Sequence, residues 1–180
     1  VTNGATLTTF TGAVTCAGTI DASNAADELL FTLAPTFTGT LKTGVGTILR
    51  FAVSSTLPAS VVLLEELRVL AGATVTLSSN LTLNDALDVT NFPGATSIIL
   101  VNGNTLTLTG GIGAAALGKI NIKNSSSLIS TGAADFTGMG NASLITDETS
   151  NLTLVAGATA FPTGSIKFNN LSLTTAGTLA

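Results

Sequence analysis

Apolar residues alternate with threonine, serine or charged residues at a period of two in many short stretches of the chain. Residues 105–109 read Thr-Leu-Thr-Leu-Thr, and similar alternation covers 74–77, 81–83, 119–123 and 152–154. A period of two places apolar side chains on one side of an extended strand and polar side chains on the other. Because glycine, asparagine, serine or proline separates these runs, the pattern predicts short, half-buried strands joined by turns.

The strand-like phrases recur along the sequence. Ser-Asn-Leu-Thr-Leu stands at 79–83 and again at 150–154, and Leu81 and Leu106 hold equivalent places in successive phrases. Gly-Ala-Thr phrases begin at Gly72 and at Gly94, and the step from Gly72 to Gly94 is similar to the step from Leu81 to Leu106. Repeats of this length are typical of stacked architectures, since one coil cannot bury its apolar row alone. We therefore predict an all-β parallel β-helix (β-solenoid) with about 22–25 residues per coil; a β-sandwich is the alternative.

The expected organisation is a single β domain over residues 1–180. Residues 61–180 form its repetitive, solenoid-like part, and residues 1–60 are less regular. Residues 60–72 have the end signals of a helix, a serine at the start and a glycine at the finish. Their sequence phrases match those of the strands elsewhere, so we interpret them as strands. Residues 24–33 are expected to hold one helical turn, because Ala25, Ala26, Asp27 and Glu28 are poor strand formers.

Several asparagines occupy positions that suit bends of the chain. Asparagine tolerates the left-handed conformation and hydrogen-bonds to its own backbone. On this ground we predict turn positions at Asn80, Asn102, Asn104, Asn151 and Asn170.

The repeats at residues 67–83 and 102–110 resemble those of secreted bacterial β-helix adhesins. The likeness extends over roughly residues 65–175 and lies in composition more than in individual residues. It implies a β-solenoid fold and a structural role at the cell surface, as in adhesins and surface filaments, and it brings no catalytic residues with it.

The composition excludes several classes of function. The chain has no histidine, one cysteine, 9% charged residues and a net charge of −4. Imidazole-dependent catalysis, His-ligated metal sites and an intrachain disulfide are therefore excluded. Six basic residues provide no cationic surface for nucleic acid. We expect a chain that is not an enzyme and has no cofactor.

No stretch has the roughly 18 uninterrupted apolar residues of a membrane helix, so membrane insertion is not expected. The most apolar stretch, 60–71, is broken by Glu65, Glu66 and Arg68. The sequence starts at Val1 without a basic segment followed by an apolar run, which suggests a processed chain or a fragment. A surface poor in charge and rich in threonine, serine and asparagine favours an extracellular or cell-surface location.

Few residues are candidates for binding chemistry. Asp85 and Asp88 are the carboxylates we would test first for calcium, although charges at turns are the simpler interpretation. Residues 111–116 match a weak dinucleotide pattern, which we interpret as a turn. Rows of threonine suggest a surface that orders water, but the Thr-x-Thr motifs do not recur at a fixed spacing, so an aligned array is not expected.

Both ends of the sequence are strand-like and uncharged. Open strand edges at the two ends of a solenoid favour head-to-tail contacts between copies, which grow into a filament when they do not close. We expect a structural extracellular protein, a self-assembling subunit or segment of a surface filament, sheath or adhesive stalk. The alternative is a glycan-binding β module of a surface adhesin, with cell-surface glycans as partners. The expected self-assembly residues are Ala5, Leu7 and Thr9 at one end and Leu171, Leu173 and Leu179 at the other.

Overall fold

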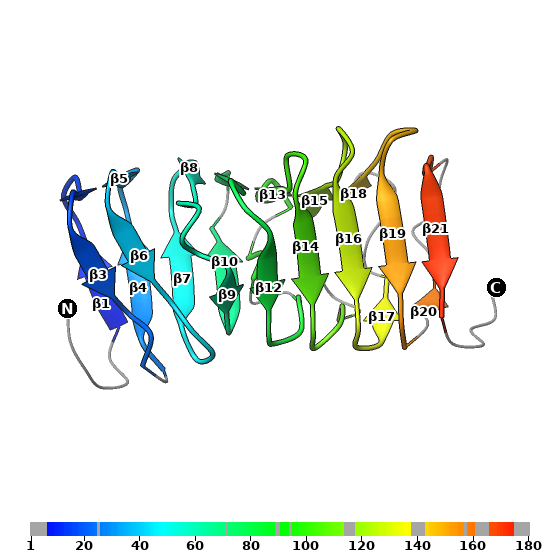
Figure 1. Cartoon of the computed structure of the whole chain (residues 1–180), viewed down its shortest axis with the longest axis horizontal. Helices are drawn as coiled ribbons and strands as arrows, with labels where there is room; N and C mark the ends of the chain where they lie inside the picture. The colour runs from blue at the N-terminus through cyan, green and yellow to red at the C-terminus, as the bar shows by residue number, and fades with distance from the viewer. Residues whose placement is uncertain are drawn as a thin grey trace.

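The chain winds into a β-solenoid of about seven turns, with about 21 residues per coil and no helix in the described part. The computed structural model describes residues 7–24, 26–70, 72–88, 91–93, 95–113, 118–137, 143–156, 158–160 and 166–174. The strands stand side by side along the long axis, with β1 and β21 at opposite ends (Figure 1). Each strand pairs in parallel with strands of neighbouring coils, which confirms the predicted β-helix over the β-sandwich. Within the described ranges, no segment is a helix of the length and apolarity that crossing a membrane requires.

Face 1 of the solenoid carries the first strand of each coil. Its four-stranded sheet runs in the order β1–β4–β7–β10. Further along, isolated bridges link Leu87 to Ile112 and Ile112 to Ala134. The strands of this face are β1 (Leu7–Phe10), β4 (Glu28–Phe31), β7 (Ile48–Phe51), β10 (Glu66–Val69), β17 (Ala134–Asp135) and β20 (Ala158–Ala160).

Faces 2 and 3 carry the second and third strands of each coil, and each face is divided into a two-stranded sheet and a longer one. Face 2 contains β2 (Thr15–Cys16), β5 (Thr36–Phe37), β8 (Ser55–Thr56), β11 (Thr74–Thr76), β13 (Ile98–Leu100), β15 (Lys119–Asn121) and β18 (Leu144–Ile145). Face 3 contains β3 (Thr19–Asp21), β6 (Thr40–Lys42), β9 (Leu63–Leu64), β12 (Leu81–Leu83), β14 (Thr105–Leu108), β16 (Ser127–Ser130), β19 (Asn151–Leu154) and β21 (Asn170–Leu173).

The core is a set of apolar rows that run along the inside of the column. Alternate residues of the strands are buried, as the period of two requires: β14, β16 and β19 all bury their second and fourth residues. In the first coils the row is aromatic. The ring of Phe31 stacks on Phe10 and Phe51, with centroids 5.0 Å and 5.2 Å apart. Stacked coils therefore bury a continuous interior that no single coil has.

The corners absorb the differences in length between coils. On face 3, Leu81 pairs with Leu106, and Leu152 pairs with Leu171, so the first of these coils is longer than the second. On face 1, the pairing of Ile48 with Glu66 closes a coil that is shorter than either. The range of coil lengths is therefore wider than predicted, and the strands remain in register because the extra residues lie outside the ladders.

Two predictions of local structure are wrong. The expected helical turn within 24–33 is a non-helical turn followed by strand β4: the N–H of Asp27 donates to the carbonyl of Asn24, and Ala26 has a φ of 67°, outside the helical region. Asn151 and Asn170 begin strands instead of lying in turns, and they pair with each other across β19 and β21. Asn102 does adopt a left-handed turn conformation, with φ of 56°. The strand interpretation of 60–72 is confirmed by β9 and β10.

Candidate functional site

The ladders are interrupted between the second and third coils, and we call this junction the seam. On face 1, β4 pairs with β7 across it. On face 2, β5 belongs to one sheet and β8 to another, and on face 3 the same is true of β6 and β9. Pro35 precedes β5 and Pro58 follows β8, and proline has no N–H to donate to a ladder. These prolines explain why pairing on face 2 stops here.

Hydroxyl groups replace the missing ladder on face 3. The Ser60 hydroxyl accepts a hydrogen bond from the backbone N–H of Leu41 at 3.1 Å and donates one to its carbonyl at 3.0 Å. The Thr43 hydroxyl donates to the carbonyl of Leu63 at 2.8 Å. Side chains therefore satisfy backbone groups that a neighbouring strand satisfies elsewhere.

On face 2 the seam is hollow. A cavity of about 520 Å³ opens between β5 and β8, lined by residues 34–37, 54–58 and Ser78. Of the lining residues, Leu57 is buried and Phe37 is partly buried against the core. None of the lining residues, all of which the structure describes, is charged. Face 2 thus opens toward the apolar interior at this one junction of its two sheets.

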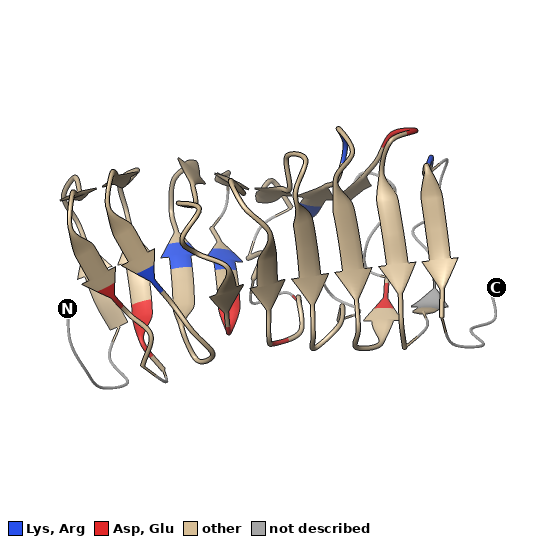
Figure 2. Ribbon diagram, viewed as in Figure 1, with Lys and Arg blue, Asp and Glu red and all other residues tan. Residues whose placement is uncertain are grey.

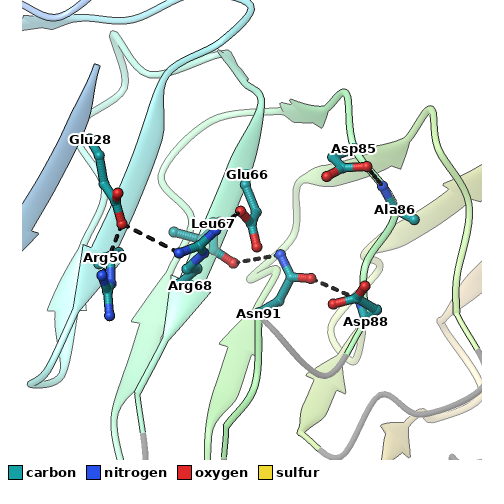
Figure 3. Close-up of polar contacts among 9 residues, drawn as sticks. All are labelled: Glu28, Arg50, Glu66, Leu67, Arg68, Asp85, Ala86, Asp88 and Asn91. Carbon is teal, nitrogen blue, oxygen red and sulfur yellow. Dashed lines mark hydrogen bonds and ion pairs between the residues drawn. The ribbon is translucent and has the colours of Figure 1, made fainter. Parts of the chain in front are cut away.

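A charged cluster spans the seam on face 1. Arg50 of β7 donates a hydrogen bond to Glu28 of β4 at 2.9 Å, and Arg68 of β10 approaches the same carboxylate oxygen at 3.4 Å (Figure 3). Arg68 also donates to Glu66 at 2.6 Å. This last hydrogen bond raises the pKa of Arg68 above its usual value, and the nearby Glu28 adds to the effect. The cluster joins three coils on the one face where backbone pairing continues through the seam.

The calcium candidates do not come together with a third carboxylate in the described part of the chain. The Asp85 carboxylate accepts a hydrogen bond from the N–H of Ala86, whereas the N–H of Asp88 donates to the side chain of Asn91 (Figure 3). The carboxylate of Asp88 lies near Arg68 and helps to raise its pKa, after the larger effect of Glu66. Among the described residues, no group of three or more His, Cys, Asp or Glu side chains is placed to hold a metal ion.

Those predicted self-assembly residues that the structure describes lie at opposite ends of the column. Leu7 is 47% exposed on β1, and Leu171 is 39% exposed on β21. Thr9 is also exposed, whereas Leu173 is partly buried against the core. Within the described ranges, β1 pairs only with β4 and β21 only with β19, so each has one open edge. Ala5 and Leu179 lie outside the described residues.

Face 3 aligns polar side chains from successive coils. Its outward positions form two registered rows, Thr82–Thr107–Ile129–Thr153–Ser172 and Thr105–Ser127–Asn151–Asn170. The strands β14, β16, β19 and β21 carry no charged residue, as their uniform tan colour in Figure 2 shows. These rows mix threonine with serine, asparagine and isoleucine, and among these four strands only β14 carries a Thr-x-Thr motif, so an aligned array of Thr-x-Thr motifs does not form on them.

Sequence reasoning did not find the seam or its hollow. Pro35 and Pro58 lie about one coil apart in the sequence, and this spacing was the only available signal. Comparisons with family models, curated proteins and solved structures found no match to this chain. The function must therefore be inferred from the solenoid itself.

Acid is expected to weaken the corners of the solenoid. Hydrogen bonds from the hydroxyl and the N–H of Thr149 lower the pKa of Asp147 from 3.8 to about 2, and the N–H of Asn124, one coil away, also donates to it. A bond to Ser23 and another to Lys42 lower the pKa of Asp21 in the same way.

Because both pKa values are lowered by folding, this stabilisation is present above pH 4 and is lost as the pH falls from about 4 to 2. Denaturant titrations across this range should show the loss. Asp147→Asn should reduce the slope of the free energy of unfolding against pH, and the double variant with Asp21→Asn should reduce this slope further. Slopes equal to that of the wild type in both variants would contradict the assignment.

Proposed function

We propose that this chain is a structural, extracellular protein, a self-assembling subunit or segment of a surface filament, sheath or adhesive stalk. Its partner would be a further copy of itself, joined head to tail. The observation that carries the proposal is the pair of open strand edges at opposite ends of the described column, on β1 and β21. All coils wind in the same direction, so one end of a copy presents strands that the other end of the next copy can pair with in parallel.

The arrangement of the ladders supports a mechanical role. Hydrogen bonds between coils run along the long axis of the column (Figure 1), which is the direction in which a filament is pulled. The inward rows of leucine, isoleucine and phenylalanine run parallel to that axis. Extension of the same ladders and rows across a junction would add no new kind of contact.

Charge on an open edge tests the proposal. Thr8→Lys and Leu171→Lys each place an ammonium group at an inward position in an end strand, in register with the buried Leu29 and Leu152, which should block strand pairing at the junction. Light scattering and negative-stain electron microscopy should show filaments of the wild type that lengthen with concentration. Each variant should hold at least about tenfold less protein in filaments, since one buried charge at the junction costs more than the equivalent of about 1.4 kcal/mol.

Val45→Lys is the matched control, because Val45 is 56% exposed and lies in a corner of the second coil, away from both end strands. This variant should assemble like the wild type. A wild-type chain that remains monomeric at high concentration would contradict the proposal. Equal loss of assembly in Val45→Lys and Leu171→Lys would show that an added charge anywhere on the surface causes the loss, not a charge at an open edge.

Glycan binding by a surface adhesin is the second candidate function. The hollow of face 2 supports it, because it combines an aromatic ring at Phe37 with exposed hydroxyl groups at Thr36 and Thr56. The two candidates are compatible, since the hollow lies on the side of the column and the open edges lie at its ends.

A further inference from the structure

We propose that the hollow between β5 and β8 is a binding site for a short, neutral oligosaccharide. This inference rests on the second candidate function, which it deepens by naming the site and the chemical class of the ligand. It does not depend on self-assembly, because none of the lining residues belongs to an end strand. The lining, the orientation of its hydroxyl groups and the rigidity of its aromatic ring each support it.

The lining matches the surface of a sugar ring, which has apolar C–H patches bordered by hydroxyl groups. The apolar part of the hollow is made by Phe37, Leu57 and the two prolines, Pro35 and Pro58. Exposed hydroxyl groups surround it, from Thr36, Ser54, Thr56 and Ser78. A charged ligand would find no ionic partner among these residues, and a wholly apolar ligand would leave the hydroxyl groups without partners.

Two of the hydroxyl groups have fixed and opposite roles. The Ser54 oxygen accepts a hydrogen bond from the N–H of Thr74 at 2.9 Å, which leaves its own proton available to a ligand. The Ser78 hydroxyl donates its proton to the carbonyl of Leu57, which leaves only lone pairs for a ligand. The hollow therefore offers one oriented donor and one oriented acceptor, the combination that a sugar hydroxyl group satisfies.

The aromatic ring of the site is held in place from behind. Phe37 meets Phe31 edge to face, with ring centroids 5.9 Å apart and an interplanar angle of 87°. Phe31 is itself fully buried between Phe10 and Phe51. A ring that is ordered before the ligand arrives loses little conformational entropy on binding. A volume of about 520 Å³ is within the usual range for ligand pockets and suits a short oligosaccharide.

The test uses three neutral probes, maltotriose, cellotriose and N,N′-diacetylchitobiose, titrated into the full chain carrying Leu171→Lys. This background keeps the protein unassembled, so failure of the site and failure of self-assembly are measured separately. At least one probe should cause saturable amide shifts in an NMR spectrum, confined to the non-proline residues among 34–37, 54–58 and 78, with a Kd of roughly 1 mM or tighter.

Substitutions then separate the parts of the site. Phe37→Ala should weaken binding about tenfold. Thr56→Val, which keeps the shape and the fold, should weaken it about threefold through loss of a hydroxyl group. Ser54→Ala should have a similar effect. Thr107→Val on face 3 is the matched control and should leave binding unchanged, because its position lies outside the hollow.

Three results would overturn the proposal. The first is no saturable shift with any of the probes. The second is binding that Thr56→Val and Ser54→Ala leave unchanged, which would place the sugar elsewhere. The third is tighter binding of an uncharged extended peptide, Gly-Thr-Ala-Thr-Gly, than of every sugar, which would mean that the seam accepts a strand.

Discussion

Replacing Phe31 with alanine is expected to lower the free energy of unfolding by about 3–5 kcal/mol. The ring is fully buried, stacks on Phe10 and Phe51, and meets Phe37 at its edge. Its loss would leave a cavity that the ladders of neighbouring coils prevent from closing. Because Phe51 lies across the seam, the substitution also removes packing between two parts of the solenoid that are joined, among the described strands, by no ladder other than β4–β7. Chemical denaturation followed by circular dichroism measures the change.

The location of the damage is as informative as its size. Hydrogen exchange in Phe31→Ala should increase first over residues 7–42, since sheets of faces 2 and 3 do not continue across the seam. Phe31→Leu is the matched control and should cost less than about 1.5 kcal/mol, because it retains most of the apolar volume. Leu128→Ala, in the middle of the six-stranded sheet, should instead increase exchange on both sides of its coil. Uniform exchange over the whole chain in Phe31→Ala would contradict the idea of a seam.

Replacing Gly132 with alanine is expected to cost about 3 kcal/mol, at the upper end of the usual range for overpacking. A Cβ atom at this position would lie 2.5 Å from the carbonyl carbon of Gly110 and 2.6 Å from the N atom of Gly111. Gly110 in turn approaches the backbone of Ala86 in the coil before it. Here the corners of successive coils stack backbone on backbone. The neighbouring atoms cannot retreat, because the strands before the corner are paired in register and bridges link Leu87, Ile112 and Ala134 after it.

Gly18→Ala is the matched control for Gly132→Ala. A Cβ atom at Gly18 would have no neighbour within 4 Å, so the substitution should be neutral or stabilising by up to about 1 kcal/mol. Thermal unfolding should therefore show a large decrease in Tm for Gly132→Ala and little change or an increase for Gly18→Ala. Equal decreases in the two variants would show that both glycines serve only backbone freedom.

Much of the fold was predictable from local pattern. The alternating runs at 74–77, 81–83, 105–109 and 152–154 appear as β11, β12, β14 and β19, with their apolar side chains inside. The prediction of a helical turn failed because backbone conformation is not set by composition alone. Ala26 adopts a left-handed φ of 67° in a turn, and the strand that follows from Glu28 pairs with β1 and β7 of the adjacent coils.

The candidate site was much less predictable than the fold. No sequence pattern marks Pro35, Phe37 and Pro58. They become neighbours only because the stacking of successive coils places β8 beside β5. The charged cluster has the same origin, since Glu28 and Arg68 lie far apart in the sequence and meet through two steps of stacking. Contacts of this kind depend on the number of residues in each corner, which no strand pattern records.

The sequence by itself determined which residues form strands and which side of each strand faces inward. These properties are local, because side chains of an extended chain alternate between two faces whatever surrounds them. Only the tertiary structure decided which positions of different coils share a rung. Coils of unequal length remain in register because their corners absorb the difference, and this alignment produces the polar rows of face 3, the stacked glycines and the seam. Stacking is a property of neighbouring coils, and it therefore depends on contacts that a single coil does not contain.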